Sequence, residues 1–267
     1  MEQPKNNLKI VADKKNARML LPNMLTLIGV CIGLTSIRFA LSGEFHLAII
    51  AIIFAALIDG LDGRIARLIK GTSKVGKELD SLTDMISFGV APAFIMYFWK
   101  LNTLGRFGWL LCLIYVICVA LRLARFNISS NQEPSWKDNF FEGVPSPAGG
   151  ILVLTPLIIS LTGFNYIELN FDIITPIFFI ATSFLLISKF PSYSFKKIVI
   201  QRKATIFLLF GIILFFGLLL IYTFEVISLS SMIYLFLLPI SYFHFQKLKK
   251  NNENDKIQED EDLEDVL

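Results

Sequence analysis

Long apolar runs separated by short polar connections form the main pattern of this chain. Eight such runs are expected to form membrane helices, because each combines high hydropathy with few charges. The pattern predicts spans at residues 22–41, 45–69, 78–99, 104–126, 148–161, 172–187, 204–224 and 227–245. The fifth span is the shortest and follows a break at Pro145 and Pro147. We therefore expect an all-α fold, a polytopic transmembrane helical bundle of about eight spans.

The two ends of the chain are polar. Residues 1–20 are basic and lack the apolar stretch of a signal peptide, so we expect a cytoplasmic N-terminal segment. Residues 247–267 change from basic to strongly acidic, and this composition predicts a disordered tail. Between these ends we expect a core domain at 21–190 and additional transmembrane spans at 191–246.

Composition and charge agree with a membrane protein. The chain is 54% hydrophobic, which is above the content of an ordinary soluble domain. The net charge of +3 is small, but lysine and arginine gather in alternate connections. Because basic connections stay in the cytoplasm, this distribution predicts both termini on the cytoplasmic side. We expect membrane lipids as neighbours and no nucleic-acid partner.

Four carboxylates lie where the second and third spans adjoin. Asp59 and Asp62 are three residues apart and Asp80 and Asp84 four apart, so each pair shares one helix face. Charge at the edge of an apolar run is costly and usually marks function. Acidic oxygens from two adjoining helices suit a hard divalent cation. The alternative is that these carboxylates form salt bridges with the neighbouring cations Arg64, Arg67, Lys70, Lys74 and Lys77.

The same stretch carries a recognisable motif. The pattern DxxDGxxAR, eight further residues and GxxxDxxxD is filled without a gap by Asp59, Asp62, Gly63, Ala66, Arg67, Gly76, Asp80 and Asp84. It resembles the signature of the CDP-alcohol phosphatidyltransferases, integral membrane enzymes that move a phosphatidyl group from a cytidine nucleotide to an alcohol. The resemblance implies that residues 21–190 form the six-span core of that family, with two extra C-terminal spans.

The resemblance also implies roles for individual residues. Asp59, Asp62 and Asp80 would bind metal, and Asp84 would combine metal binding with the role of general base. The cofactor would be Mg²⁺ or Mn²⁺, as two ions that clamp the attacking and leaving oxygens. The CDP-lipid would contact a first-span element and the motif with its loop, namely Asn23, Thr26, Gly63, Ala66, Arg67, Ser73 and Gly76. The alternative for Asn23 is that it only caps the first helix.

Three further stretches resemble the phosphatidylserine synthase branch of the family: residues 81–93, 120–127 and 143–148. The substrates implied are CDP-diacylglycerol and L-serine, and the products are phosphatidylserine and CMP. Serine has a carboxylate that needs a cation, and Arg122 or Arg125 with Asn127 are the candidates. The site would face the cytoplasm at the cell (inner) membrane, and a homodimer is left open.

Two alternatives remain at this stage. The acceptor could be another alcohol, such as glycerol 3-phosphate, inositol or choline, because the motif is common to the whole family. The chain could instead be a cation transporter whose intramembrane aspartates bind the transported ion. Transport would place charges near the middle of several spans, whereas here they gather at one end beside a cationic loop.

Overall fold

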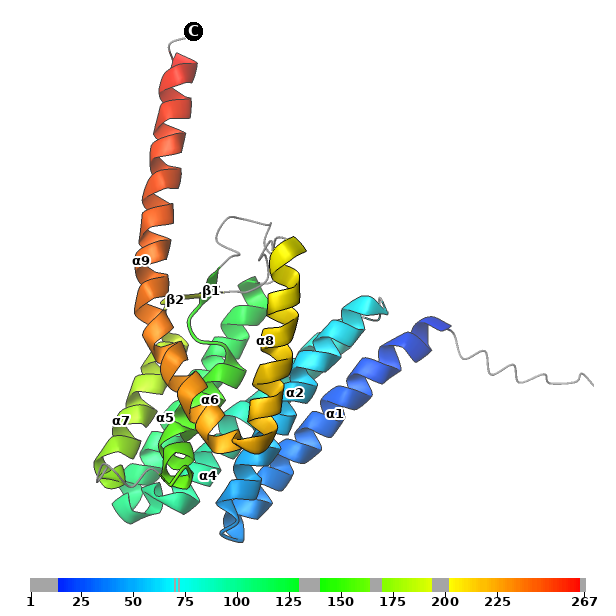
Figure 1. Ribbon diagram of the computed structural model, residues 1–267, viewed down its shortest axis with the longest axis vertical. Coiled ribbons are helices and arrows are strands. Elements are labelled where there is room, and N and C mark those ends of the chain that lie inside the picture. Colours follow the sequence, from blue (N-terminus) through cyan, green and yellow to red (C-terminus); the bar gives the residue numbers. More distant parts are fainter. Residues whose placement is uncertain are drawn as a thin grey trace, which may run out of the picture.

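A helical bundle makes up nearly all of the protein in the computed structural model, which describes residues 14–69, 71, 73–129, 140–163, 170–193 and 202–264 (Figure 1). Its helices are α1 (Lys14–Leu41), α2 (Phe45–Leu68), α3 (Lys74–Asp84), a π-helix (Met85–Val90), α4 (Ala91–Trp99), a 3₁₀ turn (Leu101–Leu104), α5 (Arg106–Ser129), α6 (Ser146–Leu161), α7 (Phe171–Ile187), α8 (Arg202–Ile221) and α9 (Thr223–Glu264). The expected all-α membrane bundle is confirmed. The sequence did not predict the short antiparallel ribbon of β1 (Phe140–Glu142) and β2 (Pro191–Tyr193).

All eight predicted spans are apolar helices close to their predicted positions. Five are long and apolar enough to cross a membrane: residues 20–41, 45–68, 74–99, 106–128 and 223–250. Three are apolar but shorter, namely Ser146–Leu161, Phe171–Ile187 and Thr205–Ile221. A helix of 16 residues is about 24 Å long, less than the thickness of a hydrocarbon core. The protein is thus a polytopic membrane bundle, and eight full crossings stay a prediction.

One expectation about a helix end differs from the structure. The segment before Glu78 was expected to be a loop, but α3 begins at Lys74. The reason is local, since the Ser73 hydroxyl accepts a hydrogen bond from Gly76 N at 2.9 Å and caps the helix. After Lys247, α9 continues as helix to Glu264, and the disorder expected for residues 247–267 stays a prediction. Adding residues to a helix that already exists avoids the cost of nucleation.

A π-helix turn directly after Asp84 joins α3 to α4. Pro92 has no N–H to donate to the carbonyl of Phe88, four residues earlier, so an ordinary helical bond is missing there. The hydroxyl of Tyr115 on α5 donates to that carbonyl at 2.7 Å, and both side chains are fully buried. A long-range contact therefore satisfies the backbone group that the proline leaves unpaired.

Glycines let neighbouring helices approach this turn. A Cβ at Gly33 of α1 would lie 2.5 Å from Ser87 Oγ and 3.1 Å from Ser87 Cα. A Cβ at Gly150 of α6 would lie 3.2 Å from Phe88 Cα. Close packing of this kind is how membrane helices associate. It holds α1 and α6 directly against the segment that follows Asp84.

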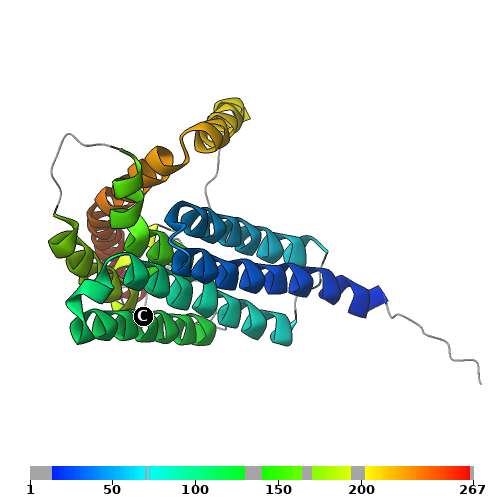
Figure 2. The same ribbon diagram turned by 90° about the horizontal axis from the view of Figure 1, so that it is seen from below.

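The helix α8 lies at the edge of the molecule. Figure 2 shows it apart from the helices of the main bundle, next to α9. Its apolar side chains are exposed along its length, including Ile206, Phe207 and Phe210. Exposed apolar surface of this extent fits contact with lipid tails.

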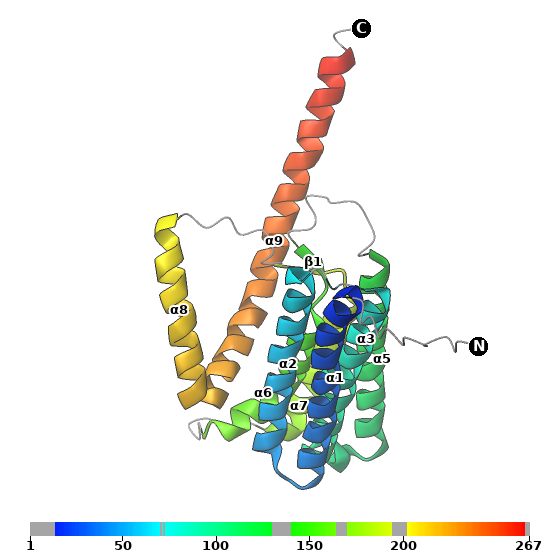
Figure 3. The same ribbon diagram turned by 90° about the vertical axis from the view of Figure 1, so that its right-hand side faces the viewer.

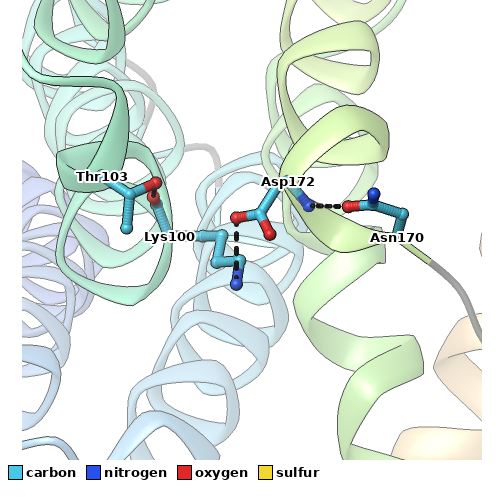
Figure 4. A network of polar contacts seen from close by, with 4 residues as sticks. All are labelled: Lys100, Thr103, Asn170 and Asp172. Carbon is cyan, nitrogen blue, oxygen red and sulfur yellow. Dashed lines mark hydrogen bonds and ion pairs between the residues drawn. The ribbon is translucent and has the colours of Figure 1, made fainter.

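Polar contacts join the C-terminal end of α4 to the N-terminal end of α7. Lys100 Nζ lies 3.0 Å from Asp172 Oδ1, and the Asn170 side chain accepts a hydrogen bond from Asp172 N at 3.1 Å (Figure 4). Both charged side chains are partly exposed, so the pair adds little stability.

Candidate functional site

The motif residues lie at one end of the bundle. The connection between α2 and α3, the C-terminal end of α5, the ribbon strand β1 and the N-terminal end of α8 all reach this end (Figure 3). The turns that join α1 to α2 and α8 to α9 lie at the opposite end. The basic connections of the sequence thus meet at the end that holds the aspartates.

Three of the four aspartates converge. Asp59 and Asp62 of α2 and Asp80 of α3 each offer one carboxylate oxygen, and these oxygens all lie within 4.8 Å of one another. Asp62 is 3% exposed, so its charge is largely removed from water. Carboxylates brought this close repel one another unless a cation lies between them. The donor set fits a hard divalent cation, which prefers oxygen ligands.

Asp84 lies beside this group but outside it. Its charge interacts with those of Asp59 and Asp80. Asp84 Oδ2 accepts a hydrogen bond from Ser146 at 2.6 Å, while Oδ1 is buried and has no hydrogen-bond partner among the described residues. A buried carboxylate oxygen without a partner leaves room for a cation or a proton.

Helix α1 fixes the orientation of Asp62. The buried Thr26 hydroxyl lies 2.7 Å from Asp62 Oδ2 and 3.0 Å from the Pro22 carbonyl oxygen, so its proton is shared between two acceptors. Thr26 was predicted to contact the CDP-lipid, and it is also a support for a cluster carboxylate. Sequence spacing could not show this contact, because the two residues are 36 positions apart.

A cavity of about 670 Å³ opens next to the cluster. All seven residues that were predicted to contact the CDP-lipid line it, which are Asn23, Thr26, Gly63, Ala66, Arg67, Ser73 and Gly76. Asp62 and Asp80 line it as well, and so do Lys74, Lys77 and Phe126. The cavity therefore joins two of the cluster carboxylates to a basic rim. The two lysines belong to the cationic segment that the sequence places beside the aspartates.

The first turn of α3 forms one wall of this cavity. Ser73, Lys74, Gly76 and Lys77 come from the N-terminal end of the helix, where free N–H groups and the helix dipole favour an anion. A Cβ at Gly76 would lie 2.9 Å from Asn23 Oδ1, so the glycine lets α1 pack against this turn. Arg67 is exposed on the facing wall, with its Nε donating to the Gly63 carbonyl at 3.1 Å. A phosphate would fit between these two walls.

The three residues proposed for serine binding do not line the cavity. Arg122 Nη1 donates to Ser146 Oγ at 2.7 Å, and Arg125 Nη1 donates to the Ile187 carbonyl at 2.7 Å. The Asn127 amide donates to Ser81 Oγ at 3.0 Å. The Arg122 guanidinium nevertheless lies next to the cavity wall, with its carbon 5.6 Å from the centroid of the Phe126 ring.

Ser146 is a residue that sequence reasoning did not single out. It links Arg122 to Asp84 through its hydroxyl and is fully buried. The only signal for it was its place between Pro145 and Pro147 in a stretch that resembles one branch of the family. In the described part of the chain the aspartates form no salt bridge with Arg64, Arg67, Lys74 or Lys77, and Lys70 lies outside the described residues.

Comparisons with known proteins point to one family. The family model described as CDP-alcohol phosphatidyltransferase matches residues 19–182. A Mycobacterium leprae protein named "CDP-diacylglycerol--serine O-phosphatidyltransferase" is 43% identical over 175 residues, covering 64% of this chain and 57% of that protein. A protein of the same name from Helicobacter pylori strain 26695 is 36% identical over 220 residues, covering 82% of this chain and 90% of the relative.

A Bacillus subtilis protein of that name is 35% identical over 177 residues, covering 66% of this chain and 92% of the relative. The chain spans only about half the length of the mycobacterial relatives that it matches.

Proposed function

The chain belongs to the CDP-alcohol phosphatidyltransferase family, and we propose that it transfers the phosphatidyl group of CDP-diacylglycerol to L-serine, giving phosphatidylserine and CMP. The observation that carries this proposal is the convergence of three motif carboxylates beside a cavity with a basic rim. The choice of serine is supported by the names of the relatives from three bacterial genera.

The CDP-lipid would bind in the cavity between α1, α2 and α3. Its diphosphate would lie between the N-terminal end of α3 and Arg67, where positive charge and free N–H groups meet. Gly63 and Ala66 have little or no side chain, so the nucleotide can approach the backbone of α2 at this side of the cavity. The acyl chains would extend into the surrounding lipid.

We assign the cofactor to the aspartate cluster. Asp59, Asp62 and Asp80, joined by Asp84, would hold Mg²⁺ or Mn²⁺ as two ions, and Thr26 would keep Asp62 in place. Bound there, the metal would neutralise the diphosphate and stabilise the departing CMP. Removal of divalent ions with a chelator should abolish turnover, and adding back Mg²⁺ or Mn²⁺ should restore it.

The chemistry left to the chain is orientation and proton transfer. The serine hydroxyl oxygen attacks the phosphorus that carries diacylglycerol, a new P–O bond forms, and the P–O bond to CMP breaks. Asp84 would take the proton of the attacking hydroxyl, which is the role that the family resemblance implies for this residue. Arg122, Arg125 and Asn127 stay the candidates for binding serine, although each already has a partner in the protein.

The site would face the cytoplasm at the cell (inner) membrane. This orientation is supported by basic residues near the end of α2, Arg64 and Arg67, and in the first turn of α3, Lys74 and Lys77. A homodimer within the membrane is the assembly that we propose, and light scattering of the purified protein would test it.

One assay separates the candidate acceptors. Purified protein is supplied with CDP-diacylglycerol, Mg²⁺ or Mn²⁺, and one alcohol at a time: serine, glycerol 3-phosphate, inositol or choline. We expect CMP release with serine and less than a tenth of that rate with each of the others. Release of CMP with a different alcohol would overturn the choice of serine but keep the family chemistry. The absence of CMP release with every alcohol would refute the enzymatic proposal.

A further inference from the structure

Ser146 lies between the charged side chains of Arg122 and Asp84, which form no direct ion pair with each other in the described part of the chain. Its Oγ lies 2.7 Å from Arg122 Nη1 and 2.6 Å from Asp84 Oδ2. Ser146 is 0% exposed and Arg122 is 8% exposed, so water does not compete for these bonds. Hydrogen bonds to charged groups in such surroundings are stronger than those between neutral groups.

The direction of the two bonds follows from the chemistry of the groups. A guanidinium has donors only, and an ionised carboxylate has acceptors only. The serine oxygen therefore accepts from Arg122 and gives its single proton to Asp84 Oδ2. Ser146 therefore holds one oxygen of the Asp84 carboxylate and leaves Oδ1, which is buried, outside this pair of bonds.

The backbone around Ser146 holds the hydroxyl in place. Pro145 is extended and Ser146 is the first residue of α6, followed by Pro147, so two prolines restrict the chain on either side. One turn later, Gly150 brings α6 against Phe88, which lies four residues after Asp84. The start of α6 and the segment that carries Asp84 are thus packed together independently of the hydrogen bonds.

We propose that Ser146 is a positioning residue for Asp84, holding Oδ2 so that the Asp84 carboxylate keeps its place beside Asp59 and the aspartate cluster. The inference rests on the proposed function, because it gives the Asp84 carboxylate a part in the transfer reaction. Arg122 then acts through Ser146 by fixing the direction of its proton. A purely structural role for Ser146 would predict loss of the fold or of the cavity instead.

The test compares Ser146→Ala with Ser146→Thr, which keeps a hydroxyl. Ser183→Ala is a matched control, because Ser183 is also buried but donates to the Phe179 carbonyl of its own helix at 2.7 Å. For each variant, turnover, KM for CDP-diacylglycerol, direct binding of CDP-diacylglycerol and the thermal unfolding temperature are measured.

We expect Ser146→Ala to lower kcat by about 10- to 100-fold, since small displacements of a reacting group have effects of this size. Its affinity for CDP-diacylglycerol should stay within about twofold of wild type, because Ser146 does not line the cavity. Ser146→Thr should recover most of the lost rate, and Ser183→Ala should behave as wild type.

Three results would overturn the inference. These are an unchanged kcat in Ser146→Ala, a loss of CDP-diacylglycerol binding that parallels the loss of kcat, and failure of Ser146→Ala to fold. Failure of the proposed function looks different, because then the wild-type protein itself releases no CMP with serine. If another alcohol is the acceptor, the same variants are compared with that alcohol.

Discussion

Gly63→Ala should weaken binding of the CDP-lipid without destabilising the fold. Gly63 lies on α2 one residue after Asp62 and lines the cavity, and a Cβ there would meet nothing within 4 Å. The added methyl group therefore fits the free protein without any rearrangement. It occupies space that the nucleotide of the CDP-lipid would need.

The size of the effect follows from the cost of overpacking. Forcing a methyl group into a packed contact costs about 1–3 kcal/mol, which corresponds to about a 5- to 150-fold weaker Kd. The unfolding temperature should stay the same or rise slightly, because alanine is a better helix former than glycine. Binding of CDP-diacylglycerol is measured by calorimetry in detergent, and unfolding by a thermal melt of the same samples.

Gly60→Ala is the matched control for this substitution. Gly60 lies three residues earlier on α2, a Cβ there would also meet nothing within 4 Å, and the residue does not line the cavity. We expect wild-type affinity for Gly60→Ala. Wild-type affinity in Gly63→Ala would refute the placement of the nucleotide, and equal losses in both variants would mean that α2 itself is disturbed.

Three further substitutions probe other parts of the structure. Asp84→Asn should lower kcat by about 10²- to 10⁴-fold while CDP-diacylglycerol binding stays measurable, and retained turnover would remove Asp84 from the role of base. Tyr115→Phe leaves the buried Phe88 carbonyl without its side-chain donor, so the free energy of unfolding should fall by about 1–3 kcal/mol. An unchanged thermal unfolding temperature would contradict this prediction. Lys100→Ala removes the ion pair with Asp172, and the free energy of unfolding should change by less than about 1 kcal/mol while turnover stays normal. A larger loss of stability would contradict the small contribution expected for a partly exposed pair.

The sequence predicted which residues of the candidate site lie close together, while their roles stay predictions. The spacing of Asp59 and Asp62 placed both on one face of α2, and the seven residues proposed for the CDP-lipid all line one cavity. The first result depends on the helical repeat, and the second on residues that were carried over from the family resemblance. The serine-binding candidates were less well defined, because an isolated arginine on a helix does not reveal which long-range partner it meets.

The sequence by itself determined where the helices lie and which end of the bundle carries the aspartates, because hydropathy and helix periodicity are properties of neighbouring residues. Only the tertiary structure decided that Thr26 supports Asp62, that Tyr115 completes the π-helix, and that Ser146 joins Arg122 to Asp84. The partners in these contacts are 24 to 62 residues apart in the chain. Such pairs form only when whole helices pack, and helix packing depends on side-chain shape over the full contact rather than on any local pattern.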